Sequence, residues 1–147
     1  MPYRHTQIGY VTLSAFAFGG TAIAWAAAPD GYTAGEIAVL GVVVAVGVLF
    51  SSLTVEIALD RMRVWFGPGW IRWAVPLREI ESASAVRVPW YVGWGMRWWG
   101  YWLYNVSGHR AVVLRLRGGR RFGIGTDEPE VLLVALRGAG VTGEGRR

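Results

Sequence analysis

The chain has 147 residues, of which 53% are hydrophobic and only 17% are charged, whereas a soluble domain usually carries about 25% charged residues. It has no cysteine and two histidines, which excludes disulfides, thiolate zinc sites and a cysteine nucleophile. All fifteen basic residues are arginine and the net charge is +5, which suits an anionic partner such as a lipid surface.

The first predicted element is a transmembrane helix over Ile8–Ala28. This run contains no charged residue, and at 1.5 Å per residue it is about 31 Å long, enough for a hydrocarbon core of about 30 Å. A cleaved signal peptide is the alternative, with Arg4 before the apolar run and alanines at its end. The run is longer than the apolar region of a signal peptide, and Pro29 would follow the cleavage point, so we favour a retained helix.

A second transmembrane helix is predicted over residues 34–53. Thr33 and Glu36 have the S/T-x-x-E spacing of a capping box, which places the helix start at Ala34. Residues 1–53 are therefore interpreted as a transmembrane hairpin. Small residues such as Gly20 and Gly41 would let the two helices approach closely.

Both chain termini are predicted to be cytoplasmic. Arg4 precedes the hairpin, and arginines from Arg61 onward follow it, whereas the connecting loop carries Asp30 and Glu36 and no arginine. Basic residues stay on the cytoplasmic side of a membrane. The expected location is the inner, cytoplasmic membrane, with a multi-pass topology.

A β-domain is predicted over residues 54–138, because hydrophobic residues alternate with polar ones from Thr54 onward. Asp60 and Arg61 are predicted to form the first turn. The last element is a helix over residues 127–137, capped by Thr126 or Asp127, with Pro129 in its first turn; residues 139–147 are predicted to be disordered. The predicted strands are 54–59, 62–66, 70–75, 79–88, 97–104, 111–117 and 121–125.

Seven antiparallel strands followed by one helix are the element order of a pleckstrin-homology (PH) barrel. Several short motifs accompany this order: Phe66-Gly67-Pro68-Gly69, Val75-Pro76-Leu77 with Ile80, Pro89-Trp90-Tyr91, Gly93-Trp94-Gly95, Asn105-Val106-Ser107-Gly108 and Ile124–Pro129. In these residues the chain resembles the bacterial PH-domain-like small membrane proteins, in which a two-helix hairpin precedes such a barrel. The resemblance implies an α+β membrane protein with a seven-stranded antiparallel barrel or sandwich closed by the C-terminal helix, acting as a membrane-tethered interaction module.

An aromatic segment over residues 90–104 is the first candidate contact surface. Indole rings favour the headgroup region of a bilayer, so this segment is predicted to lie against the membrane or the hairpin. The alternatives are that the rings fill the barrel core and its open end, or that they contact a partner protein. The candidate contact residues are Trp90, Tyr91, Trp94, Trp98, Trp99 and Trp102.

An arginine set is the second candidate surface. From residue 54 onward there are fourteen arginines and eight acidic residues, a net charge of +6. Arginines near an anionic surface contribute about 1 kcal/mol each, although a solvated β-face is the alternative for each of them. The residues predicted to contact an anionic surface are Arg61, Arg63, Arg72, Arg78 and Arg97.

No catalytic, metal or cofactor residues are predicted. Ser107, His109 and Asp127 lack a G-x-S-x-G nucleophile turn, and the basic residues do not gather on one helix as in a nucleic-acid-binding protein. We therefore predict a non-enzymatic, membrane-anchored interaction or scaffold module at the cytoplasmic face, with a protein partner or self-association and no small-molecule substrate. The alternative function is a peripheral domain that binds anionic lipid and is tethered by its own hairpin.

Overall fold

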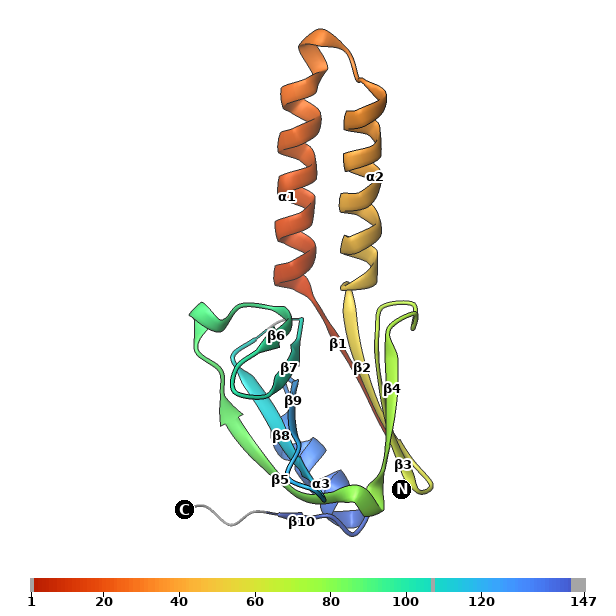
Figure 1. Cartoon of the computed structure of the whole chain (residues 1–147), viewed down its shortest axis with the longest axis vertical. Helices are drawn as coiled ribbons and strands as arrows, with labels where there is room; N and C mark the ends of the chain where they lie inside the picture. Colours follow the sequence, from red (N-terminus) through yellow and green to blue (C-terminus); the bar gives the residue numbers. More distant parts are fainter. Residues whose placement is uncertain (1, 107, 144–147) are drawn as a thin grey trace.

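A computed structural model describes residues 2–106 and 108–143 of the chain. It has an α+β fold in which two antiparallel helices project from one end of a β-domain (Figure 1). The helices are α1 (Tyr10–Ala27) and α2 (Ala34–Leu49), joined by the 3₁₀ turn η1 (Ala28–Asp30). A third helix, α3 (Pro129–Gly138), lies at the opposite end of the β-domain.

Helix α2 starts where the sequence predicts, because the capping box forms. The Glu36 backbone N–H donates to the Thr33 hydroxyl oxygen at 3.3 Å, and the Thr33 N–H donates to the Glu36 carboxylate at 2.8 Å. The helix ends at Leu49 instead of residue 53, because the chain enters a strand at Ser52. Helix α1 begins at Tyr10 instead of Ile8 for the corresponding reason, since a strand precedes it.

This preceding strand is a feature that the sequence analysis missed. Strand β1 (Tyr3–Ile8) pairs antiparallel with β2 (Ser52–Ala58), from Tyr3 opposite Ile57 to Ile8 opposite Ser52. The predicted boundary between residues 53 and 54 is therefore wrong. The β-domain begins at Tyr3, and the helical hairpin is inserted between its first two strands.

The strands form two sheets, not one antiparallel set of seven. The first sheet has the order β1-β2-β3-β4 and the second the order β10-β5-β8-β9-β7-β6. Pairs β7–β9 and β10–β5 are parallel. The other strands are β3 (Arg61–Phe66), β4 (Arg72–Pro76), β5 (Ile80–Arg87), β6 (Gly95–Trp98), β7 (Trp102–Asn105), β8 (Arg110–Leu116), β9 (Arg121–Gly125) and β10 (Thr142–Gly143).

Two further predictions need correction. The strand predicted over residues 97–104 is a hairpin of β6 and β7, which turns at Gly100 with a φ of 73°. The predicted disordered tail contains β10, which pairs with β5 at Ser82 and Ala83, while residues 144–147 lie outside the described residues.

One hydrophobic core lies between the two sheets and is closed by α3. Phe66, Val64 and Leu114 are fully buried in it, as is Leu136 of the helix. Helix α3 begins at Pro129, two residues after the predicted start at residue 127, and Pro129 occupies its first turn as predicted. The predicted caps do not form, because the Thr126 hydroxyl accepts the N–H of Glu128, one residue before the helix.

The turn between β2 and β3 is formed by Leu59 and Asp60, not by Asp60 and Arg61 as predicted. Ala58 and Arg61 pair across it. Leu59 has a φ of 56° and its side chain is fully exposed. The left-handed region costs a residue with a Cβ atom about 1–2 kcal/mol, so this turn carries backbone strain without any compensating packing.

We expect Leu59→Gly to raise the free energy of unfolding by about 0.5–1 kcal/mol, because glycine adopts a positive φ without steric cost but loses more chain entropy on folding. The measurement is urea denaturation of the full chain in detergent micelles. Leu59→Ala is the control, since it removes the same exposed side chain but keeps the Cβ atom. An equal gain in both variants would show that backbone strain is not the cause.

Candidate functional site

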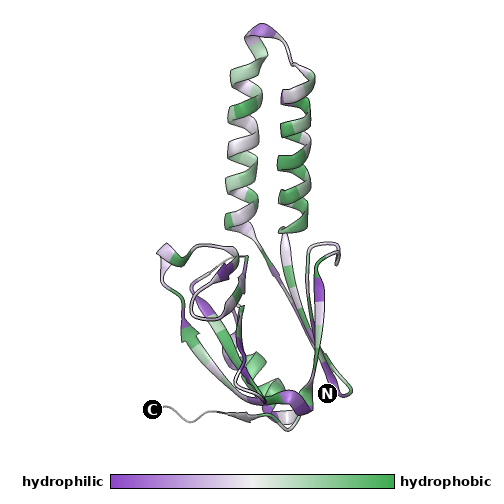
Figure 2. Cartoon of the chain, in the orientation of Figure 1, coloured by the Kyte–Doolittle hydropathy of each residue, from purple (hydrophilic) through white to green (hydrophobic). Residues whose placement is uncertain are grey.

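Figure 2 colours most residues of the two helices from white to hydrophobic green, and many of their apolar side chains are exposed. Phe18 and Trp25 of α1 are 79% and 80% exposed, and Val42 and Val44 of α2 also face outward. By length and composition, one helical segment of the described chain, Tyr10–Asp30, could cross a membrane, while the apolar α2 is shorter. Two helices that are hydrophobic all round and pack only on each other are typical of a segment that water does not surround.

Aromatic residues occur at both ends of this hairpin. Tyr10 stands exposed at the base of α1, next to the β-domain. Trp25 and Tyr32 lie at the far end, where the Tyr32 hydroxyl donates a hydrogen bond to the Ala24 carbonyl at 3.0 Å. Tyrosine and tryptophan at both ends of an apolar segment are the pattern found at the two membrane–water interfaces.

The base of the hairpin is fixed to the β-domain by close backbone contacts. The Gly9 N–H donates to the Ser51 carbonyl at 2.8 Å, and the Thr12 hydroxyl donates to the Val106 carbonyl at 2.8 Å. Gly67, in the loop between β3 and β4, lies so close to α2 that a Cβ atom there would be 2.5 Å from the Val48 carbonyl oxygen. The β-domain therefore has a defined orientation relative to the helices.

Three exposed aromatic residues lie on the end of the β-domain that faces the hairpin, and we call them the aromatic rim. Trp70 belongs to the β3–β4 loop, and Trp90 and Tyr91 belong to the 3₁₀ turn η3 (Trp90–Val92). Their side chains are 79%, 76% and 71% exposed. Both segments lie beside the base of the helices in Figure 1. Sequence analysis named Trp90 and Tyr91 but placed Trp70 in a strand, which in fact begins at Arg72.

The other predicted aromatic contacts are distributed over different surroundings. Trp94 is partly buried beyond η3, and Trp99 packs against a small second core of Val88, Leu103 and Ala111. Trp98 and Trp102 are opposite each other in the β6–β7 pair, with ring centroids 5.7 Å apart. Because Gly95 and Asn105 form the hairpin-facing end of that pair, Trp98 and Trp102 lie at its other end.

The predicted arginine set is not gathered on one surface either. Strand register places Arg61, Arg63 and Arg72 on the outer face of the four-stranded sheet. Arg78 lies in η2 (Leu77–Glu79), at the end of the β-domain away from the hairpin, and Arg97 is in β6, where its Nε donates to the Trp94 carbonyl. All five side chains are exposed, and two of them, Arg63 and Arg72, line a common site on the sheet face.

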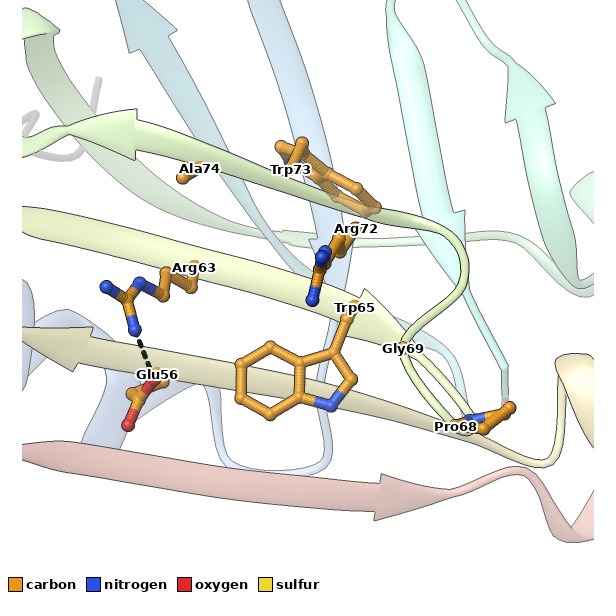
Figure 3. A pocket seen from close by; sticks show the side chains of 8 residues that line it. All are labelled: Glu56, Arg63, Trp65, Pro68, Gly69, Arg72, Trp73 and Ala74. Carbon is orange, nitrogen blue, oxygen red and sulfur yellow. Dashed lines mark ion pairs between the residues drawn. The ribbon is translucent and has the colours of Figure 1, made fainter.

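A basin of about 520 Å³ occupies this outer face (Figure 3). Its lining includes Glu56, Arg63, Trp65 and Arg72, with Pro68 and Gly69 at the end nearest the hairpin. Arg63 is 3.9 Å from the Glu56 carboxylate, whereas Arg72 forms no ion pair with any described residue. The Arg4 guanidinium lies 5.5 Å from the centre of the Trp65 ring. The basin is therefore a positively charged surface with an aromatic floor.

A separate polar cluster joins β1 to the start of α3. His5 Nε2 is 2.7 Å from an Asp127 carboxylate oxygen, and His5 Nδ1 contacts the Glu128 carboxylate. Burial raises the pKa of the nearby Tyr3 phenol, and these two carboxylates raise it further. These contacts hold the N-terminal strand in place.

Within residues 2–106 and 108–143 no group of histidine, aspartate or glutamate side chains could hold a metal ion, and Ser107 lies outside the described residues.

No family model matches the chain, and comparison with curated proteins finds no match either. The geometry of the hairpin, the aromatic rim and the basin therefore carries the functional argument.

Proposed function

We propose that this chain is a non-enzymatic, membrane-anchored PH-like interaction module whose hairpin crosses the bilayer and whose β-domain works at the cytoplasmic face. The observation that carries the proposal is the aromatic rim beside the base of an exposed apolar hairpin. Exposed aromatic residues are costly in water, and a bilayer interface accepts both their apolar rings and their polar groups.

The length of the hairpin supports this arrangement. Helix α1 has 18 residues and α2 has 16, so they are about 27 and 24 Å long. This is shorter than a hydrocarbon core of about 30 Å, and a short segment thins the bilayer or draws its flanking residues inward. The fixed joint at Gly9 and Gly67 would then bring the aromatic rim into the headgroup region.

Single-cysteine labelling tests the topology, since the natural chain has no cysteine. We expect Asp30→Cys, in the loop between the helices, to react with a membrane-impermeant maleimide in intact spheroplasts. Arg117→Cys, on the exposed turn after β8, should react only after the membrane is opened. Equal labelling of both positions before permeabilisation would contradict the proposed membrane insertion.

The aromatic rim makes a second prediction. The measurement uses vesicles that contain lipids brominated close to the headgroup, where bromine quenches the emission of nearby tryptophans. Trp70→Phe and Trp90→Phe should each lower the quenched fraction of the tryptophan emission, because each removes a tryptophan that lies near the interface. Trp102→Phe is the matched control, since this exposed residue lies at the far end of the β6–β7 pair. A larger loss of quenching in the control than in the rim variants would contradict the proposed docking.

A protein partner is the second candidate, and strand β6 is the observation that favours it. This strand is the edge of the six-stranded sheet, and its Met96, Arg97 and Trp98 side chains are exposed. An open edge can pair with a strand of another chain. A photo-crosslinker at Met96 in membranes should then capture a partner or a second copy, and the same probe at Arg117 should not.

A further inference from the structure

We propose that the basin on the outer face of the four-stranded sheet binds the phosphate of an anionic glycerophospholipid from the adjoining leaflet, with Arg72 as its principal ligand. The inference rests on the proposed membrane anchoring and adds to it one defined headgroup site.

Strand register gives the depth of the basin below the membrane. Ile8 and Ser52 are the last paired residues before the helices, and the row that contains Thr54, Trp65 and Arg72 lies two residues further along β2. Thr6, which pairs with Thr54, is four residues before the start of α1 at Tyr10, so at about 3.4 Å per residue this row is at most about 14 Å from the helix. The headgroup layer on each side of a bilayer is about 5–8 Å thick. The row therefore lies close to its cytoplasmic side, and the long Arg72 side chain can extend back towards the lipid phosphates.

The next outward-facing row lies too deep in the cytoplasm for such a contact. Glu56 and Arg63 are two residues further along their strands than Thr54 and Trp65, at most about 20 Å from the start of α1. The single acidic side chain of the basin therefore stands beyond the headgroups, where it is paired with Arg63. The charge nearest the membrane therefore belongs to Arg72, whereas Arg4 pairs with Glu56 in the deeper row and extends its guanidinium over the Trp65 ring.

The side chains offer the chemistry that a phosphodiester requires. The exposed Arg72 guanidinium has no acidic partner among the described residues and can donate two parallel hydrogen bonds to phosphate oxygens. Figure 3 shows the indole nitrogen of Trp65 on the side of its ring towards Pro68, which is the side nearest the hairpin. Its N–H is a donor only, and it can add one bond to the same phosphate.

The test measures lipid binding to the full chain in neutral detergent micelles by native mass spectrometry, with phosphatidylglycerol and phosphatidylcholine as probes. We expect tighter binding of phosphatidylglycerol, about fivefold weaker binding in Arg72→Gln, and a smaller loss in Trp65→Phe. Arg78→Gln is the control, because it removes the same charge from an exposed position at the far end of the β-domain. Circular dichroism should show that all variants remain folded.

Equal binding of the two lipids, or equal losses in Arg72→Gln and Arg78→Gln, would overturn the proposal. A soluble probe, glycerol 3-phosphate, separates the lipid from a free phosphate: displacement of phosphatidylglycerol at equal concentration would assign the basin to a free phosphate and overturn the lipid source. The cysteine labelling described above reports on membrane insertion independently. If the labelling pattern is as expected but the protein shows no preference for phosphatidylglycerol, only the proposed lipid site is overturned. If the labelling pattern differs from the expected one, the proposed membrane anchoring is overturned.

Discussion

Replacing Gly67 by alanine is expected to lower the free energy of unfolding by about 3 kcal/mol, because two costs add at this position. Gly67 has a φ of 43°, which costs a residue with a Cβ atom about 1–2 kcal/mol. The new Cβ atom would also lie 2.5 and 2.7 Å from the carbonyl oxygens of Val48 and Leu49, and such overpacking costs typically 1–3 kcal/mol. Urea denaturation in micelles, followed by tryptophan fluorescence, measures the sum.

Gly119→Ala is the matched control for this variant. Gly119 also has a positive φ, of 84°, but no atom lies within 4 Å of the position of its Cβ. The control therefore carries the backbone cost without the steric one. Equal losses in the two variants would mean that the β3–β4 loop does not press against α2, and the fixed joint between hairpin and β-domain would then be in doubt.

Phe66→Ala is expected to cost about 3–5 kcal/mol, the usual range for deleting a buried aromatic ring. The Phe66 side chain is fully buried, and its ring centroid lies 5.0 Å from that of Phe50, 6.1 Å from that of Trp73 and 6.3 Å from that of Tyr104 in the second sheet. The ring thus joins the end of α2 to both sheets, and its loss should destabilise the joint together with the core. The same denaturation experiment measures the effect.

Phe18→Ala is the appropriate comparison, because it deletes an identical ring from a 79% exposed position on the hairpin. It should change the stability of the β-domain by less than about 0.5 kcal/mol in micelles. A comparable loss in both variants would indicate that the hairpin and the β-domain unfold as one unit.

The parts of the fold that the sequence predicts well are those with local signals. The spacing of Thr33 and Glu36 places the start of α2 correctly, because a capping box involves only neighbouring residues. In β8, Val112, Leu114 and Leu116 are buried while Arg115 is exposed, as the alternation predicts. Pro129 marks the start of α3 for the same local reason.

The parts that sequence analysis missed depend on distant partners. Strand β1 contains Arg4, His5 and Gln7, and its partner strand lies on the other side of the hairpin. The two strands are separated by the whole helical hairpin, so no short stretch of sequence contains both and their pairing was not visible. The split of residues 97–104 at Gly100 was missed because aromatic residues continue across the turn.

In the candidate site, too, local signals were visible in the sequence and the dependence on distant segments was not. Composition alone predicted that tryptophans and arginines matter, but it could not separate Trp90 from Trp102 or Arg72 from Arg78, since their positions relative to the hairpin follow from strand register. The position of Trp70 could have been predicted from a local signal. Trp70 directly follows Gly67-Pro68-Gly69, and because glycine and proline mark turns, it is expected in the loop, where its side chain is exposed.

The pairing of β1 with β2 means that the helical hairpin, which we propose as the membrane anchor, occupies the place of an ordinary reverse turn. Gly9 and Ser51 already stand side by side, joined by a hydrogen bond of 2.8 Å, so a two-residue Asn-Gly connection could replace residues 10–50 without disturbing the register. Excising the hairpin in this way would remove its exposed apolar helices and keep all four strands of the sheet. A simple truncation at Ser52 would instead discard the edge strand β1.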